Sequence, residues 1–451
     1  MYNLNAKDLT QGNPAKTLMT FTLPFMLANL FQVLYGLVDT FMVGRFADSA
    51  ALASVSLGSL VMVATNFIII GLTAGGTVLI GQYLGAKMDK DAEETISTMF
   101  TLYSILAVGF TIIYLLIASP LLRLINAPSE AFEGALTYLR ICFVGTFFTF
   151  GYNALSSALR GMGDSKNPLL FVAIACSCNI VGDFVLVGLL NMGAGGAAIA
   201  TTASQAISMI IGIVYLKHRK FVFDFRLSSF RIVSEKAGIL LKLGIPMGLQ
   251  EALVLVSFMF IAAIINRMGY VATAASGILD RLFTVAIIPA GAFSTALAAM
   301  VAQNIGAEKP ERAKKCLKIG VILGFSVSVV IFAVAELAPA QIVRIFSRDA
   351  AVIDASCDYI VFYAFDFLLC GIVFPMLGFL NGCGLTRLTM GINIISAFAI
   401  RAPVCYLLVR VLGERLYYVG IGFPIATVVQ IILALIFILR GKWKKIVIVS
   451  D

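Results

Sequence analysis

Long apolar stretches alternate with short polar segments from one end of the chain to the other. Each apolar stretch reaches the roughly 20 residues that a helix needs to cross a hydrocarbon core of about 30 Å. The pattern therefore predicts twelve membrane-spanning helices and an all-α integral membrane protein. The predicted spans cover residues 17–43, 52–83, 97–119, 134–158, 168–191, 196–216, 238–265, 273–303, 317–338, 357–380, 388–411 and 420–440.

The second half of the chain repeats the first at a shift of 221 residues. Gln82 falls on Gln303, and Gly161 falls on Gly382. Each half then holds six spans, and because six is even, both halves enter the membrane in the same orientation. We therefore expect two parallel six-helix lobes. A duplication of this size in so apolar a chain points to a secondary transporter, since such proteins commonly bind substrate between internal repeats.

A polar, charge-rich segment at residues 217–242 separates the two halves. We interpret it as a cytoplasmic linker between an N-terminal lobe of residues 1–216 and a C-terminal lobe of residues 243–451. Most of the 33 Lys and Arg residues lie in the N-terminal tail, the even-numbered loops and the C-terminal tail. The positive-inside rule then predicts a multi-pass protein of the cell membrane with both termini in the cytoplasm.

Composition narrows the function further. The chain is 60% hydrophobic and only 13% charged, and its net charge of +9 is explained by basic cytoplasmic loops, so we expect no nucleic-acid partner. The one histidine lies in the linker, the eight cysteines form no CxxC pair, and no P-loop occurs. We expect no cofactor, an ion gradient as the energy source, and a monomer whose partners are small molecules and membrane lipids.

Charged residues inside the first-half spans are the strongest candidates for chemistry, since each costs on the order of 3 kcal/mol at the bilayer centre. Asp39 in span 1 and Asp183 in span 5 lie at one depth, roughly 22 Å from the start of each span. Asn179 shares a helix face with Asp183, and Thr201 reaches the same level. Singly, the amide and hydroxyl could be interhelical hydrogen bonds. Together the four side chains suit a hard cation or an exchangeable proton.

The second-half spans carry Glu251, Asp280, Asp366 and Arg401. Two interpretations are open. The arginine and a carboxylate could form a buried pair that locks helices together, or these residues could form a substrate or cation site in the second lobe. Asp280 is followed by Arg281, but adjacent residues point about 100° apart on a helix, so these two do not pair with each other.

Aromatic residues are scattered along the spans, and we expect most of them to pack or to face lipid. Tyr35, Phe150 and Phe258 are candidates for lining a cavity for flat organic cations, because aromatic faces attract positive charge.

Several segments resemble the motifs of multidrug and toxic compound extrusion (MATE) transporters. Gln303–Lys309 and its twin Gln82–Lys87 resemble the motif that ends the second helix of each lobe, and similar matches are Val38–Thr40, Arg160–Lys166 and Asn381–Arg387. The resemblance covers nearly the whole chain. It implies a cation-coupled antiporter that exports organic, mostly cationic drugs and toxic compounds, driven by Na⁺ or H⁺, while two lobes rock between inward-open and outward-open states.

The resemblance also assigns residues. Those that match the family's first-lobe cation site, which would hold Na⁺ in a sodium-coupled protein, are Asp39, Asn179, Asp183, Thr201 and, through its backbone carbonyl, Ala197. Glu251 and Asp366 match acids of the second lobe in the NorM-like branch. Asp280 has no place in the family pattern that we can identify.

Two other functions remain as alternatives. A lipid-linked saccharide flippase of the related superfamily would be expected to have a net basic cavity, whereas here the acids inside the spans outnumber the two arginines. A membrane-embedded enzyme such as an acyltransferase is disfavoured, because no histidine lies in a span and no nucleophile–base pair is clustered. We therefore expect a transporter and no enzymatic activity.

Overall fold

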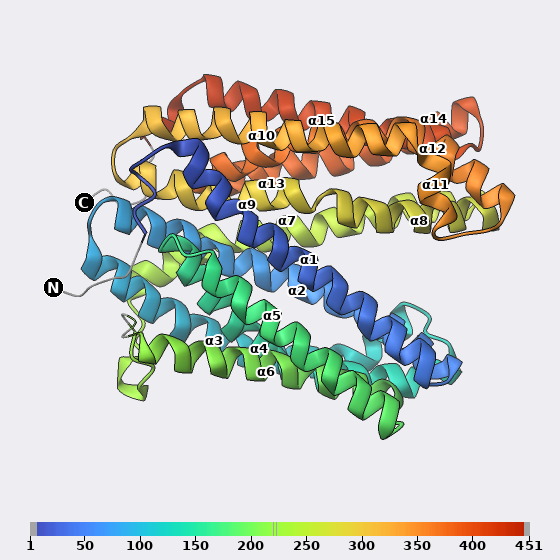
Figure 1. The fold of residues 1–451 in the computed structure, drawn as a ribbon, viewed down its shortest axis with the longest axis horizontal. Coiled ribbons are helices and arrows are strands. Elements are labelled where there is room, and N and C mark those ends of the chain that lie inside the picture. The colour runs from blue at the N-terminus through green and yellow to red at the C-terminus, as the bar shows by residue number, and fades with distance from the viewer. Residues whose placement is uncertain (1–6, 220, 222, 446–451) are drawn as a thin grey trace. The chain divides into compact units, whose positions relative to one another are not determined.

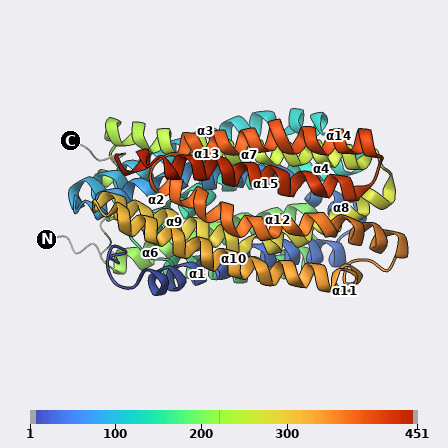
Figure 2. The same ribbon diagram turned by 90° about the horizontal axis from the view of Figure 1, so that it is seen from above.

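The computed structural model describes residues 7–219, 221 and 223–445. Within these ranges all regular structure is helical and no strand occurs (Figures 1 and 2). Twelve segments are long and apolar enough to cross a membrane, one for each predicted span. The prediction of an all-α protein with twelve membrane spans is confirmed.

The helices are numbered in chain order. The first half contains α1 (Pro14–Phe46), α2 (Ser49–Gly85), α3 (Asp89–Leu124), α4 (Ser129–Gly161), α5 (Lys166–Asp183), the π-helix η1 (Phe184–Leu189) and α6 (Gly193–His218). The second half contains η2 (Leu227–Ser229), α7 (Ser234–Asn266), α8 (Tyr270–Ala286), α9 (Ile288–Gly306), α10 (Pro310–Leu337), α11 (Pro339–Arg344), α12 (Ala350–Gly382), α13 (Thr386–Ile394), the π-helix η3 (Ile395–Arg401), α14 (Ala402–Leu412), α15 (Leu416–Leu439) and η4 (Lys442–Lys445).

All twelve helical segments begin a few residues before the predicted apolar spans, because the helices continue into polar residues. At the starts of α2 and α12 a side chain supplies one of the missing acceptors. The Asp48 carboxylate accepts a hydrogen bond from the Ala51 amide at 2.7 Å at the start of α2. The Asp349 carboxylate does the same for the Ala351 amide at 2.9 Å at the start of α12. The apolar pattern thus locates the spans but not the residues at which the helices begin.

One predicted span is interrupted. Residues 273–303 fall on two helices, α8 and α9, and the break comes at Ile287, just before Pro289. Proline has no N–H to donate and disfavours helical backbone in the residue before it, which accounts for the break.

The motifs that occur at equivalent positions of the two halves form turns with the same backbone conformation. Gly163 after α4 and Gly384 after α12, which are equivalent at the shift of 221, have φ values of 80° and 81°. Lys87 after α2 and Glu308 after α9 are also equivalent, with φ values of 59° and 56°. Left-handed backbone at the end of a helix favours glycine, so helix termination explains the second glycine of each Gly-x-Gly segment. The first, Gly161 or Gly382, lies in the helix, where a Cβ would meet the backbone of a neighbouring helix.

By internal contacts the chain forms two compact units. Unit 1 comprises Met1–Asp8 and Leu27–Gly248, and unit 2 comprises Leu9–Met26 and Leu249–Asp451. The first half of α1 thus belongs to unit 2, and the first half of α7 belongs to unit 1. Each change of unit falls two residues after a proline, Pro24 in α1 and Pro246 in α7.

Each unit is built around the fourth span of its repeat. In unit 1, α4 packs against α2, α3 and α6, and in unit 2, α12 packs against α8, α9, α10 and α15 (Figure 1). The predicted lobe boundaries describe the sequence repeat, and their outermost residues, 1–6 and 446–451, lie outside the described residues. So do Lys220 and Val222 of the linker.

Candidate functional site

The predicted first-lobe residues lie on three helices of unit 1. Asp39 is on the second half of α1, Asn179 and Asp183 end α5, and Thr201 is on α6. Asn179 and Asp183 are fully buried, and Asp39 is only 5% exposed. Ala197 is also fully buried, four residues before Thr201 on the same face of α6.

Polar atoms in this cluster lack partners. Both carboxylate oxygens of Asp183, Oδ1 of Asp39, both amide atoms of Asn179 and the hydroxyl of Thr201 are buried without a hydrogen bond. The two carboxylates are close enough for their charges to interact, and Asp183 lies beside Asn179. Buried polar atoms in proteins are nearly always paired, so a concentration of unsatisfied oxygens marks a place for a ligand or a proton.

The local backbone changes where the acids lie. The α-helix α5 ends at Asp183, and the π-helix η1 begins at Phe184. Short π-helical segments inside α-helices occur frequently at functional sites. The sequence pattern gave no sign of this change, because Phe184–Leu189 is as apolar as its neighbours.

The structure adds other residues to the cluster. Tyr35, one turn before Asp39, has a buried hydroxyl that interacts with Thr201 and with Asp39. From the sequence, Tyr35 is a candidate for lining a substrate cavity, whereas the structure places it beside the first-lobe acids. Tyr138 and Cys142 on α4 also lie near Asp39 and were not predicted. Apolar and aromatic residues at helical spacing usually indicate packing alone, which is why no signal singled them out.

In unit 2, Asp366 on α12 is 2% exposed. The hydroxyl of Thr427 donates to its Oδ1 at 2.5 Å, and the Sγ of Cys370 lies 3.9 Å from its Oδ2. The carboxylate therefore has partners from α12 and α15, unlike the acids of unit 1.

Arg401 ends the π-helix η3 and is 7% exposed. Its guanidinium carbon lies 5.0 Å from the ring centre of Phe258 and 5.4 Å from that of Phe423. No carboxylate of the described residues comes within ion-pair distance of it, although its charge interacts with that of Asp366. Two aromatic faces therefore hold this cation in place of a direct salt bridge.

Other second-half candidates are placed differently. Glu251 is half-buried and accepts a hydrogen bond from Gln250 at 3.3 Å. Asp280 is exposed, and its charge interacts with Tyr363, which also interacts with Asp366 and Arg401. The structure thus brings Asp366, Arg401 and Phe258 to one region, with Asp280 near it.

Phe150, the remaining aromatic candidate, belongs to unit 1. Its ring is fully buried, with its centre 5.5 Å from that of Phe110 and 6.4 Å from that of Tyr103. In the described part of the chain no group of three or more His, Cys, Asp or Glu could hold a metal ion. Two carboxylates with an amide and a hydroxyl are instead a hard, all-oxygen donor set, which fits an alkali cation or a proton.

The chain has twelve membrane spans in two repeats, and the first repeat buries two acids without a basic side chain beside them. These features define a multi-pass membrane transport protein. The family model MatE matches residues 24–185 and matches again at residues 246–407, well over half of the chain. The chain belongs to the MATE family. The two matches begin at Pro24 and Pro246, which agrees with the internal duplication.

Similar proteins are found at full length. The chain is 30% identical over 450 residues to the probable multidrug resistance protein YpnP of Bacillus subtilis, covering 99% of this chain and 100% of that protein. It is 27% identical to the probable multidrug resistance protein NorM of Thermotoga maritima, covering 95% and 93%. A solved structure of a MOP superfamily transporter from Pyrococcus furiosus matches the fold with a TM-score of 0.90, at 24% identity over 97% of this chain and 98% of that chain.

Proposed function

We propose that this protein is a cation-coupled antiporter, which exports organic, mostly cationic compounds across the cytoplasmic membrane by alternating access, with Na⁺ or H⁺ as the coupling ion. The observation that carries the proposal is the buried pair Asp39 and Asp183, in which Oδ1 of Asp39 and both carboxylate oxygens of Asp183 are buried without a hydrogen bond. The names of similar proteins, including the multidrug export protein MepA of Staphylococcus haemolyticus at 26% identity over 82% of this chain, support drug export as the activity.

The physical basis is charge balance. Two carboxylates in a buried site without a base cannot both stay ionised unless a cation lies between them or one of them takes a proton. Asn179 and Thr201 add oxygen ligands of the kind that hard cations prefer. The net charge of the site therefore changes when the coupling ion binds. If the two conformations of the transporter differ in their affinity for that ion, its binding shifts the equilibrium between them.

The residues grouped in unit 2 suit the substrate. Phe258, which is only partly buried, offers an aromatic surface to a flat organic cation, and the exposed Asp280 offers negative charge. Glu251 is a further acid on α7. We propose that the protein acts as a monomer without a cofactor, and that both termini lie in the cytoplasm as the distribution of Lys and Arg predicts.

Dye efflux from proteoliposomes tests this function. Ethidium should leave under an imposed Na⁺ gradient or an imposed pH gradient, and the effective gradient identifies the coupling ion. Asp39→Asn and Asp183→Asn should each abolish gradient-driven efflux. Asp224→Asn in the exposed linker is the matched control and should keep it. Efflux that persists unchanged in both membrane variants would refute the coupling role, and a protein that moves no organic cation under either gradient would refute the function.

A further inference from the structure

The repeated Gln-x-x-Gly-Ala motif at the ends of α2 and α9 has no role in the cation site. In unit 2 this region holds the chain that precedes α1. The Gln303 side chain accepts a hydrogen bond from the Leu9 amide at 2.9 Å. Arg312, at the start of α10, donates to the carbonyl oxygens of Gln11 at 2.6 Å and Gly12 at 2.9 Å.

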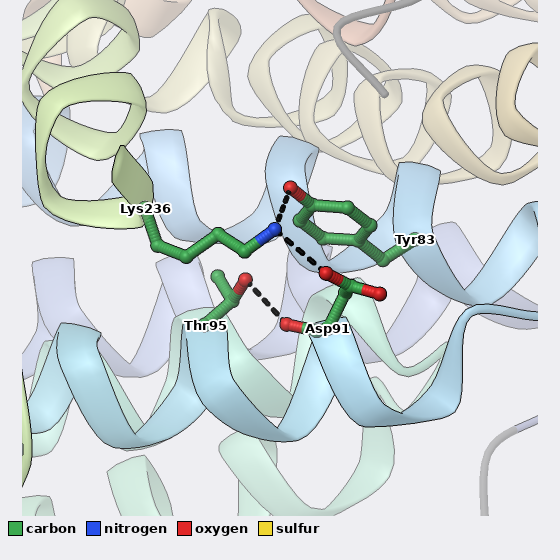
Figure 3. Close-up of polar contacts among 4 residues, drawn as sticks. All are labelled: Tyr83, Asp91, Thr95 and Lys236. Carbon is green, nitrogen blue, oxygen red and sulfur yellow. Dashed lines mark hydrogen bonds and ion pairs between the residues drawn. The ribbon is translucent and has the colours of Figure 1, made fainter. Parts of the chain in front are cut away.

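In unit 1 the corresponding region holds the start of α7. The Lys236 ammonium donates to Oδ1 of Asp91 at 2.7 Å and to the Tyr83 hydroxyl at 2.5 Å (Figure 3). The same nitrogen lies 4.2 Å from the centre of the Tyr83 ring. Lys236 is only 5% exposed, and Thr95 supports this turn of α3 by donating to the Asp91 carbonyl at 2.7 Å.

The two contacts use equivalent positions. At the shift of 221, Asp91 corresponds to Arg312 and Tyr83 corresponds to Asn304, whose side chain donates to the Leu9 carbonyl at 3.4 Å. Each repeat therefore binds the entry to the other repeat's first helix, but with opposite charge. In one case an acid binds a lysine, and in the other an arginine binds backbone carbonyls.

Two further contacts attach the same part of α7. The Val233 amide donates to the Thr98 hydroxyl at 3.1 Å. A Cβ added to Gly75 would lie 2.9 Å from the backbone nitrogen of Gly244, so α2 and α7 meet backbone to backbone. Tyr83 and Asp91 lie where α2 ends and α3 begins, at an even-numbered loop, which the distribution of Lys and Arg assigns to the cytoplasm, and Thr98 and Gly75 lie further along the same two helices.

We propose that Lys236, Asp91 and Tyr83 form a gating latch, which holds the start of α7 against α2 and α3 and must release before substrate enters from the cytoplasmic side. The inference rests on the proposed alternating access. A buried ion pair contributes little net stability, because desolvation offsets the attraction. The Asp91 side chain is already 29% exposed, so release exchanges the pair for two hydrated charges at low cost. The contact therefore holds the start of α7 in one position but can break without a large cost in free energy.

Spin-label distances test the latch without transport. Labels are placed on Lys90→Cys and Glu235→Cys, both exposed positions, in a background without other cysteines. Lys236→Met should shift the ratio of long to short distances by roughly 10-fold toward the long, open form, since it leaves the partly buried Asp91 carboxylate and the Tyr83 hydroxyl without their cation. Lys236→Arg should retain the short distance. Arg226→Met, which removes a cation from an exposed linker pair, is the matched control and should change nothing. Equal distributions in Lys236→Met and its parent would overturn the proposal.

Cross-linking tests the requirement for release. Asp91→Cys with Lys236→Cys is bridged by a cleavable bifunctional thiol reagent, and efflux should fall to background and return after cleavage. Asp91→Cys with Thr95→Cys, which bridges one helix, is the control and should keep its efflux. Full efflux by the bridged first pair would overturn the latch. Absence of efflux in the parent protein would instead refute the proposed function, because the spin-label distances do not depend on transport.

Discussion

Helix α5 carries one aspartate near each end, and the two should respond in opposite ways to the same substitution. Asp164, just before the helix, accepts hydrogen bonds from the amides of Lys166 at 2.9 Å and Asn167 at 3.1 Å. Asp183, at the other end, is fully buried and neither of its oxygens has a partner. We predict that Asp183→Asn stabilises the protein when no coupling cation is present, whereas Asp164→Asn destabilises it.

The magnitude follows from what each carboxylate loses. Asparagine leaves a polar group at the same place, so the substitution removes only the buried charge and its repulsion from Asp39, and Asp183→Asn should raise the free energy of unfolding by about 1 kcal/mol. Asp164→Asn keeps an acceptor but removes the charge at a helix N-terminus, which should cost about 0.3–1 kcal/mol. If Na⁺ is the coupling ion, a concentration of 100 times its Kd should stabilise the unsubstituted protein by about 2.7 kcal/mol and Asp183→Asn by almost nothing.

A thiol-reactive fluorescent dye can follow thermal unfolding, because six of the eight cysteines are buried and become reactive on unfolding. The measurement compares the three proteins in Na⁺-free buffer at high pH, in Na⁺, and at low pH. Protons should stabilise the unsubstituted protein if H⁺ is the coupling ion. A lower melting temperature for Asp183→Asn than for the unsubstituted protein in cation-free buffer at high pH would refute the reasoning, as would full stabilisation of that variant by the coupling ion.

Two further predictions concern unit 2. Gly382→Val should reduce the yield of folded protein in size-exclusion chromatography, because a Cβ there would lie 2.6 Å from the Ala298 carbonyl oxygen. Gly391→Ala is the control and should be tolerated, because a Cβ at that position meets no atom within 4 Å. Equal yields of the two variants would contradict the packing argument. Arg401→Met should lower the free energy of unfolding by about 1–2 kcal/mol, because it removes a cation that rests on the rings of Phe258 and Phe423 and whose charge interacts with that of Asp366; a variant as stable as the unsubstituted protein would show that neither interaction contributes to stability.

The sequence was sufficient to predict the membrane spans, because few backbone structures can cross a membrane. A run of about 20 apolar residues without frequent charge has to be a helix, and twelve such runs gave twelve helical segments. The repeat also predicted the turns, since Gly163 and Gly384 adopt the same left-handed backbone. These features depend on local chemistry that recurs in each half.

Other features depend on contacts between distant residues and were not predictable. The apolar pattern cannot show that Arg401 rests between two phenylalanine rings without a carboxylate in direct contact, because any buried acid of the second half was an equally good partner. The π-helices have the same composition as their α-helical neighbours. The first half of α1 belongs to unit 2 and the first half of α7 belongs to unit 1. The hydrophobic pattern could not predict this, because it locates helices but does not show which helices they contact.

The two π-helices lie in equivalent spans of the two repeats, and each adjoins a charged residue that the other repeat lacks. η1 begins directly after Asp183, and η3 ends at Arg401, and both lie in the fifth span of their repeat. The same kind of backbone distortion therefore carries an acid without partners in one repeat and a resident cation in the other. A carboxylate near a fixed guanidinium already has a positive charge beside it and attracts a mobile cation less strongly than an acid pair without a base. For the antiporter proposed above, this asymmetry favours one coupling-cation site per chain, formed by Asp39 and Asp183 in unit 1.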